Sequence, residues 1–208
     1  MIQRSQEWFQ SRYGKFTGSQ ISKLMKSGRA KDKVFSDTAM SYIYDVLAEI
    51  LTDGKSAEAK EFTSKATDWG NKYEPEAIEM YQQFTGDIVD ECGFIRSMEY
   101  FGASPDGLIG EDGVIECKCP FNTSNHIKHL LCETIEDIPD EYAWQMQAEL
   151  LATGRKWVDF VSYDPRCDER TCLKVMRIER DEEVMTQLTE RITLATQELL
   201  SILTKIKQ

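Results

Sequence analysis

One short stretch of the chain carries residue types at a spacing that could hold a metal ion. Asp106 lies in a Ser-Pro-Asp-Gly tetrapeptide, Glu116 follows ten residues later, and Lys118 comes two positions after that. The segment 114–119 alternates like a β-strand, so Glu116 and Lys118 should share one face while its apolar side chains occupy the other. The charges of an otherwise apolar strand therefore lie together, in a stretch that should be interior.

The turn before this strand decides how close the two acids come. Residues 110–113 read Gly-Glu-Asp-Gly, which predicts a hairpin that folds Asp106 back towards Glu116. An odd loop length or a bulge would set the two carboxylates directly opposite each other, and an even loop would offset them by one residue. Two buried carboxylates repel unless a cation lies between them, and Mg²⁺ is a hard cation that prefers oxygen ligands. Pro-Asp-Gly alone is an ordinary turn and Glu-x-Lys alone an ordinary charged edge strand, but their combination favours a magnesium site.

The Asp–x(n)–Glu-x-Lys arrangement is the signature of the PD-(D/E)XK nucleases, and the wider chain resembles the phage-lambda-type exonucleases of the YqaJ-like viral recombinase family. The resembling motifs follow one another in order through about residues 7–181. They are Glu7-Trp8-Phe9-x-x-Arg12-x-Gly14 with Thr17-Gly18-Ser19, Trp69-Gly70-x-x-Tyr73-Glu74, Ser104-Pro105-Asp106-Gly107, Glu116-x-Lys118-Cys119-Pro120-Phe121, Tyr142-x-x-Gln145-x-Gln147, Tyr163-Asp164-Pro165-Arg166 and Ile178-Glu179-Arg180-Asp181. The resemblance implies the restriction-endonuclease-like fold, of α/β (α+β) class, with a mixed central sheet flanked by helices.

The resemblance also implies which residues hold metal. Asp106 and Glu116 would bind the catalytic Mg²⁺ together with the backbone carbonyl of Cys117. Glu74 would help Asp106 to hold a second Mg²⁺, and Mn²⁺ would be able to replace either ion. Without the resemblance, Glu74 would be interpreted as an exposed glutamate at the start of a helix.

Two further residues would act near the reacting phosphate. Lys118 would orient or activate the attacking water, and Gln145 would lie near the scissile phosphate. The structural alternative for Gln145 is a place on the polar face of a helix over 140–153. The residue pattern alone predicts the same role for Lys118, because a lysine beside a metal site can position or help deprotonate a water.

A second group of residues matches a pocket for the DNA 5′-phosphate. Arg12 matches the residue that receives this phosphate, a task suited to the forked guanidinium group. Ser19, Arg29 and Ser104 fall at supporting positions, although the loop around Arg29 matches only in length and basic character. Trp8 is a candidate DNA contact, with a plain core tryptophan as the alternative.

The function implied by the resemblance is that of a Mg²⁺-dependent 5′→3′ exodeoxyribonuclease. It would act on the ends of linear double-stranded DNA, release 5′-mononucleotides and leave 3′ single-stranded tails for recombination by strand annealing. The implied partners are two further copies in a homotrimeric ring and a single-strand annealing protein. Two other functions stay open: another PD-(D/E)XK enzyme, such as a structure-specific or restriction-type endonuclease, and a non-catalytic DNA-end-binding protein, which the intact Asp, Glu and Lys disfavour.

The charge distribution bears on DNA binding. The net charge of −11 argues against a nucleic-acid partner, because phosphate binding favours a basic surface. However, residues 1–34 carry eight Lys/Arg against two acids, a local +6, whereas the other 174 residues carry 17 basic and 34 acidic side chains. A basic N-terminal segment on an acidic body predicts local gripping of a DNA end. A merely solvated basic segment is the alternative that charge alone leaves open.

Composition predicts one globular domain over residues 1–208. The chain is 41% hydrophobic and contains no repeat, low-complexity tract or linker-like stretch. No apolar run approaches the roughly 18 residues that a membrane helix needs, and the polar N-terminus lacks the apolar core of a signal peptide. We therefore expect no membrane association and a cytoplasmic location.

The cysteines and histidines suggest alternatives to a magnesium enzyme. Six cysteines without a secretory signal should be reduced, mostly buried thiols. Zinc or an iron–sulfur cluster is the rival interpretation, but no Cys-x-x-Cys pair occurs. His126 and His129 lie one helical turn apart and could chelate a metal, although an exposed pair is the commoner case.

Periodicity and turn residues predict the elements that position these side chains. We expect a short helix over 16–27, capped from Thr17 or Ser19, and a helix over about 38–52 capped by Ser36-Asp37. An exposed loop over 54–66 should lead to a third helix that ends at Gly86, with Pro75 in its first turn or at a kink. The expected strands are 88–96, 100–103, 108–109 with 114–119, 157–163 and 171–178, with a helix over about 140–153 and a long amphipathic C-terminal helix from 181.

Overall fold

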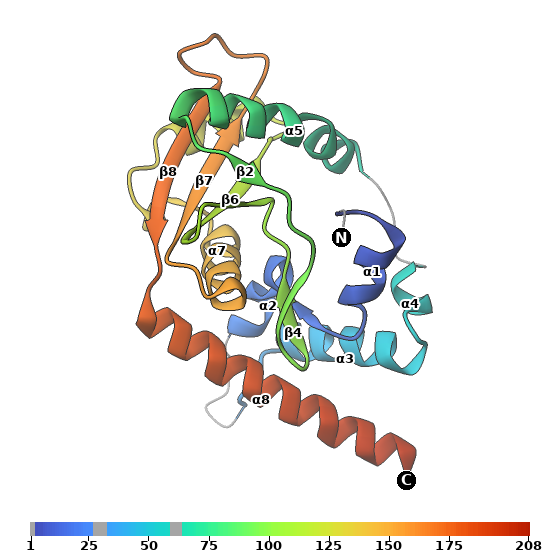
Figure 1. Ribbon diagram of the computed structural model, residues 1–208. Helices are drawn as coiled ribbons and strands as arrows, with labels where there is room; N and C mark the ends of the chain where they lie inside the picture. The colour runs from blue at the N-terminus through green and yellow to red at the C-terminus, as the bar shows by residue number, and fades with distance from the viewer. Residues whose placement is uncertain (1–2, 27–32, 59–63) are drawn as a thin grey trace.

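A mixed five-stranded sheet forms the centre of the computed structural model, which describes residues 3–26, 33–58 and 64–208 (Figure 1). In order across the sheet, the strands are β2 (Val89–Asp90), β5 (Gly107–Ile109), β6 (Gly113–Lys118), β7 (Trp157–Tyr163) and β8 (Leu173–Glu179). β6 and β7 pair in parallel, whereas the other neighbouring pairs are antiparallel. The expected mixed central sheet is thus confirmed.

A second sheet of three strands lies beside the first. Its order is β1 (Phe16–Thr17), β4 (Phe101–Ala103) and β3 (Ile95–Met98). The predicted single strand over 88–96 is therefore wrong, because β2 and β3 belong to different sheets. The chain crosses between the sheets at residues 91–94, and the period of the apolar residues does not reveal such a crossing.

Helices cover the two faces of the five-stranded sheet. α5 (Lys65–Thr85) packs on β6, β7 and β8 from one side, and α7 (Asp140–Thr153) contacts β6 and β7 from the other (Figure 1). α6 (Thr123–Leu130) also packs on β7, and a 3₁₀ turn, η2, spans Ile135–Asp137. Strand alternation divides the core accordingly: Ile115 and Val161 pack with the α5 residues Ala77 and Tyr81, while Val114 packs with the cluster that contains α7.

The long C-terminal helix is confirmed as α8 (Glu182–Lys207), with Asp181 as its N-cap. It lies along the outside of the molecule against α2 (Ser22–Met25), α3 (Asp37–Leu51) and α7 (Figure 1). Its buried residues recur at helical spacing: Met185, Leu188, Ile192, Ala195 and Leu199. None of the helices within 3–26, 33–58 and 64–208 is long and apolar enough to cross a membrane.

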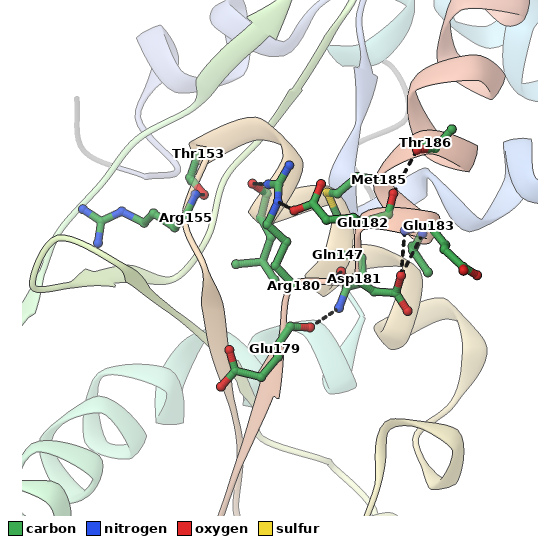
Figure 2. A network of polar contacts seen from close by, with 12 residues as sticks. Gln147, Thr153, Arg155, Glu179, Arg180, Asp181, Glu182, Glu183, Met185 and Thr186 are labelled. Carbon is green, nitrogen blue, oxygen red and sulfur yellow. Dashed lines mark hydrogen bonds and ion pairs between the residues drawn. The ribbon is translucent and has the colours of Figure 1, made fainter.

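Gln147 fixes the junction of α7, β8 and α8. Its Nε2 donates to the carbonyl of Glu179 at 2.9 Å, and its Oε1 accepts from the backbone nitrogen of Asp181 at 3.1 Å (Figure 2). Arg180 donates to the carbonyl of Leu150 at 2.7 Å. Gln147 is almost fully buried, and these bonds join α7 to the end of β8 and the start of α8.

The predicted helix over 16–27 is confirmed only over Ser22–Met25, and its predicted start is wrong. Phe16 and Thr17 instead form β1, followed by a 3₁₀ turn, η1 (Gly18–Gln20), and by α2, while residues 27–32 lie outside the described part of the chain. The backbone nitrogen of Phe16 donates to the carbonyl of Tyr100 at 2.8 Å, and that of Thr17 to the hydroxyl of Tyr42 at 2.9 Å. Pairing with a distant strand therefore overrides the local preference.

The other helix predictions are confirmed in part. α3 begins after Ser36, whose side chain accepts from the nitrogen of Ala39, and α7 ends at Gly154 in the left-handed conformation. α5 ends at Gly86 as predicted, but Pro75 lies in its interior rather than in its first turn. A short helix, α4 (Lys55–Glu58), occupies part of the expected 54–66 loop, of which residues 59–63 are not described.

The histidine pair is buried, so the expectation of an exposed pair is wrong. His126 and His129 lie in α6, a helix that the sequence reasoning missed. The Nδ1 atoms of both rings lie within hydrogen-bond distance of Ser162 Oγ, at 2.8 and 2.9 Å, and Nε2 of His126 donates to the carbonyl of Thr171 at 2.7 Å. These bonds explain how two imidazoles are accommodated inside the fold.

His129 should make the protein less stable in mild acid. Burial, followed by the charges of neighbouring basic residues, lowers the pKa of His129 to about 4. Since an unfolded histidine has a pKa near 6.5, the unfolded state binds the extra proton, and stability is lost as the pH falls from about 6.5 towards 4. We expect the contribution of His129 to the free energy of unfolding, taken as the difference between the native protein and His129→Gln in urea, to fall by about 2 kcal/mol between about pH 7.5 and pH 5. His129→Gln should show a smaller fall, and an equal fall in both proteins would contradict this role.

Candidate active site

A three-residue turn sets the register of the hairpin that carries the two central acids. Ile109 pairs with Gly113 and Gly107 pairs with Ile115, so residues 110–112 form the loop, which is the odd-length case. The backbone nitrogen of Asp106 donates to the carbonyl of Ile115 at 3.1 Å. The ladder ends at the Gly107–Ile115 pair, and Asp106 and Glu116 are the next residues on the two strands.

Glu116 and Lys118 lie on the same face of β6, as strand alternation predicts. Glu116 is 2% exposed, and its Oε1 accepts from Lys118 Nζ at 2.5 Å and from Gln145 Nε2 at 2.6 Å. Lys118 Nζ also donates to Gln145 Oε1 at 3.2 Å. The three residues, which come from β6 and α7, therefore form a closed hydrogen-bonded set around one carboxylate oxygen.

The electrostatics of this set favour a bound cation. Burial raises the pKa of Asp106 well above its ordinary value, and the neighbouring carboxylates Glu116 and Glu74 raise it further. Burial alone would lower the pKa of Lys118, but the charges of Glu116 and Asp106 outweigh it and raise the pKa above its ordinary value. Lys118 is therefore protonated in this site. The carboxylates Asp106, Glu116 and Glu74 still outnumber the positive charge that Lys118 supplies.

Glu74 approaches this set from α5. It lies in the interior of that helix, is half-buried, and accepts from Nη2 of Arg4 at 2.5 Å. Burial raises the pKa of Glu74, and Arg4 opposes the shift. Next to Arg4, Gln3 donates from Nε2 to the carbonyl of Pro105 at 2.5 Å. Residues 3 and 4 thus contact Glu74 and the residue before Asp106, and the sequence did not predict these contacts.

The donor set fits a divalent cation. Oε2 of Glu116 is buried and has no hydrogen-bond partner among the described residues, and an orphaned buried carboxylate oxygen is costly. The Cys117 N–H donates to Asp106 Oδ2 at 2.7 Å. Since a strand residue presents its N–H and C=O to the same edge, the Cys117 carbonyl faces Asp106 as well. Within the described ranges no three His, Cys, Asp or Glu side chains are grouped to hold an ion by themselves, so backbone oxygen and water would have to complete the coordination.

The candidate 5′-phosphate residues form a second cluster next to these acids. Ser104 Oγ accepts from Trp8 Nε1 at 2.9 Å and from Arg12 Nη1 at 3.2 Å. The Arg12 guanidinium stacks 4.1 Å from the centre of the Trp8 ring. Both residues lie in α1 (Gln6–Arg12), a helix capped by Ser5 that was not predicted. Because Ser104 precedes Asp106 by two residues, this cluster adjoins the acidic cluster along the chain.

Ser19, which the sequence places in the phosphate pocket, is not brought into this cluster. Ser19 lies in η1 and is exposed, and no described hydrogen bond joins it to Arg12 or Ser104. Arg29 lies outside the described residues. The guanidinium of Arg12 is largely buried, and burial lowers its pKa against the raising effect of Tyr42 and Glu49.

Sequence reasoning missed one buried acid beside this site. Glu149 lies one turn after Gln145 on α7, is 1% exposed, and its Oε1 accepts from Gln145 Nε2 at 2.9 Å. Burial and then the charge of Glu116 raise its pKa well above the ordinary value. The spacing of four residues from Gln145 was the signal available in the sequence.

A cavity opens beside Lys118. It measures about 460 Å³, and its walls include Phe121, Lys128, His129 and Tyr142. Lys118 Nζ lies 4.5 Å from the centre of the Tyr142 ring at this wall. The six cysteines, including Cys119 in this wall, are free thiols.

Comparison with known proteins places the chain in a family. The family model for the YqaJ-like viral recombinase domain matches residues 7–156. A solved structure of an alkaline exonuclease (LHK-Exo) from Laribacter hongkongensis is 34% identical, with a TM-score of 0.83 over 98% of this chain and 96% of that one. LHK-Exo in complex with dAMP is 34% identical, with a TM-score of 0.84 over the same shares.

A phage-related exonuclease from Haemophilus somnus 129PT is 19% identical, with a TM-score of 0.71 over 92% of this chain and 96% of that one, and shows the fold alone. No curated protein matches the sequence. The family match and the likeness to LHK-Exo cover most of the chain and include the acids, Lys118 and Arg12. The chain belongs to the YqaJ-like viral recombinase domain family.

Proposed function

We propose that this chain is a Mg²⁺-dependent exonuclease that degrades linear double-stranded DNA in the 5′→3′ direction. It would release 5′-mononucleotides and leave 3′ single-stranded tails for recombination by strand annealing. The observation that carries the proposal is the adjacency of two clusters: the carboxylates with Lys118, and the Arg12–Ser104 pair two residues along the chain from Asp106. Membership of the family and the likeness to an alkaline exonuclease support a nuclease that acts on DNA.

The residues of the first cluster have distinct tasks in this proposal. Asp106, Glu116 and the carbonyl of Cys117 would hold one Mg²⁺, and Glu74 with Asp106 would hold a second. Bound Mg²⁺ would supply positive charge to the phosphate and favour attack by water. Lys118, a cation among these acids, would orient that water by donating a hydrogen bond.

Gln145 belongs beside the scissile phosphate in the same proposal. Both hydrogens of its amide nitrogen point to carboxylates, Glu116 and Glu149. With both hydrogens engaged in this way, the Gln145 amide holds Glu116 and does not donate to DNA. The cavity beside Lys118 offers room for the strand or the nucleotide next to the cleaved bond.

Arg12 gives the proposed enzyme its direction. A terminal 5′-phosphate carries more negative charge than an internal phosphodiester, and a forked guanidinium binds it through paired hydrogen bonds. Ser104 and Trp8 hold Arg12 in place, and the basic segment that contains Arg29 would add positive charge. LHK-Exo has been solved in complex with dAMP, which supports mononucleotides as products here. A homotrimeric ring around DNA and a single-strand annealing protein are the partners we propose.

Linear and closed-circular forms of one plasmid test the proposal. With Mg²⁺, the linear duplex should be digested to acid-soluble nucleotides, the closed circle should stay intact, and chelation by EDTA should stop digestion. Rapid cutting of the closed circle would support the alternative of an endonuclease with the same acids and lysine. Binding to ends without digestion would support a non-catalytic end-binding protein.

A further inference from the structure

Glu149 is a fully buried acid for which the proposed reaction has so far no use. It lies on α7 and is 1% exposed. Its Oε1 accepts from Gln145 Nε2, its Oε2 is buried without a hydrogen bond from any donor of the described residues, and its carboxyl group lies within hydrogen-bond reach of the Glu116 carboxyl group. No lysine or arginine forms an ion pair with it within the described ranges.

Stability does not explain why a carboxylate occupies this position. Burial of an acid without a cationic partner is costly, and replacement of buried charges by apolar groups of similar volume is often neutral or stabilising. Position 149 faces the side chains of Gln145 and Glu116, so the reason for a carboxylate here lies in what it does to these groups.

The hydrogen bonds show what the carboxylate does instead. An amide has two N–H donors and one oxygen. Gln145 donates to Glu116 Oε1 at 2.6 Å and to Glu149 Oε1 at 2.9 Å, and its oxygen accepts from Lys118 at 3.2 Å. Glu149 thus anchors the outer side of the amide, so that the inner N–H stays on Glu116 Oε1 and Oε2 of Glu116 is left without a partner.

We propose that Glu149 is a positioning residue that acts through Gln145 to orient Glu116 towards a divalent cation. This inference rests on the proposed function, since it assumes that Glu116 is a metal ligand. Residues that hold a metal ligand by hydrogen bonds typically change metal affinity or activity about ten- to a hundredfold when they are replaced. The role differs from direct ligation, because it depends on an acceptor oxygen for Gln145 and not on the negative charge.

Three variants separate this role from a structural one. Glu149→Met removes the acceptor and keeps the length of the side chain, whereas Glu149→Gln keeps an oxygen that can accept from Gln145. Gln147→Met is the matched control, because Gln147 is equally buried on α7 but bonds to Glu179 and Asp181 on the far side from Glu116. The probe is Ca²⁺, which binds oxygen ligands without the need for turnover, and its affinity is measured by calorimetry alongside Tm.

Glu149→Met should bind Ca²⁺ about ten- to a hundredfold more weakly, with Tm unchanged or raised. Glu149→Gln should bind Ca²⁺ within about threefold of the native protein, since one hydrogen bond is retained. Gln147→Met should show the opposite pattern, a lower Tm with native affinity. The Mg²⁺ concentration that gives half-maximal digestion should shift in the same order.

Native Ca²⁺ affinity in Glu149→Met, or a protein that no longer folds, would overturn the proposal. Equal losses in Glu149→Gln and Glu149→Met would also overturn it, because they would assign the effect to charge. Digestion by the native protein is a separate control: if the native chain neither binds Ca²⁺ nor digests linear duplex with Mg²⁺, the proposed function fails.

Discussion

Asp106→Ala should lower the rate of Mg²⁺-dependent digestion of linear duplex DNA by about a thousandfold or more, with the protein still folded. Asp106 and Glu116 are the next residues beyond the last pair of the hairpin ladder, and Asp106 is the acid that both proposed ions share. Its carboxylate is held by the Cys117 N–H, and its burial among acids raises its pKa. Burial of Asp106 among other acids lowers the stability of the folded protein. Replacement by alanine removes this penalty, so Tm should be unchanged or higher.

The measurement is release of acid-soluble nucleotides at saturating Mg²⁺. Glu111→Ala is the matched control, because Glu111 is an exposed acid in the turn of the same hairpin, and it should keep the native rate. Ca²⁺ should allow DNA binding by the native protein without turnover, since its longer and looser coordination misplaces the reacting groups. Near-normal digestion by Asp106→Ala would show that the acids are assigned wrongly.

Arg12→Ala should remove most of the preference for 5′-phosphorylated ends. Charge-assisted hydrogen bonds of this kind contribute roughly 1.5–3 kcal/mol, which corresponds to about ten- to a hundredfold in rate or binding. The native protein should therefore digest a 5′-phosphorylated linear duplex faster than the same duplex with 5′-hydroxyl ends by that factor. Ser104 and Trp8 already hold the guanidinium in place, so little ordering is needed when phosphate binds.

The two ends are compared in one assay, with labelled duplexes that differ only in the terminal phosphate. Arg170→Ala, which replaces an exposed arginine elsewhere, should leave the preference intact, and Ca²⁺ affinity should be native in both variants. Equal rates of native digestion on the two ends would remove the case for a phosphate pocket at Arg12.

The hairpin and the strand faces could be predicted because they depend on local rules. Side-chain alternation placed Glu116 and Lys118 together, and the Gly-Glu-Asp-Gly turn predicted the hairpin. The helix over 37–51 and the C-terminal helix begin at capping side chains, Ser36 and Asp181, and the helix over 140–153 ends at Gly154. The structure has all three within a residue or two of their predicted bounds.

The remaining elements depend on contacts between distant residues. α6 carries few apolar residues, and its two histidines are buried because Ser162 and Thr171 supply hydrogen bonds from far along the chain. Phe16 and Thr17 form a strand because Phe101 and Gly102 lie beside them. The spacing of apolar residues within a short segment does not reveal such long-range contacts.

The same reason limits prediction of the site. Motif resemblance named Gln145, but not the buried acid one turn later, whose importance is visible only once Glu116 lies beside Gln145. The Arg4–Glu74 ion pair joins residues about seventy positions apart. Long-range pairs of this kind require the fold itself.

The turn at residues 110–112 also constrains how the chain can change length. Exposed turns are usually where insertions and deletions accumulate. Arg155 donates from Nη1 to the carbonyls of Ile109, Gly110 and Gly113, which holds this turn in its three-residue form. One residue more or less would make the loop even and offset Asp106 from Glu116 by one position, on the opposite face of the hairpin. The number of turn residues is therefore fixed by chemistry at the other end of the hairpin, whereas the residue types at positions 111 and 112 can vary more freely than Gly110, whose φ of 51° favours glycine.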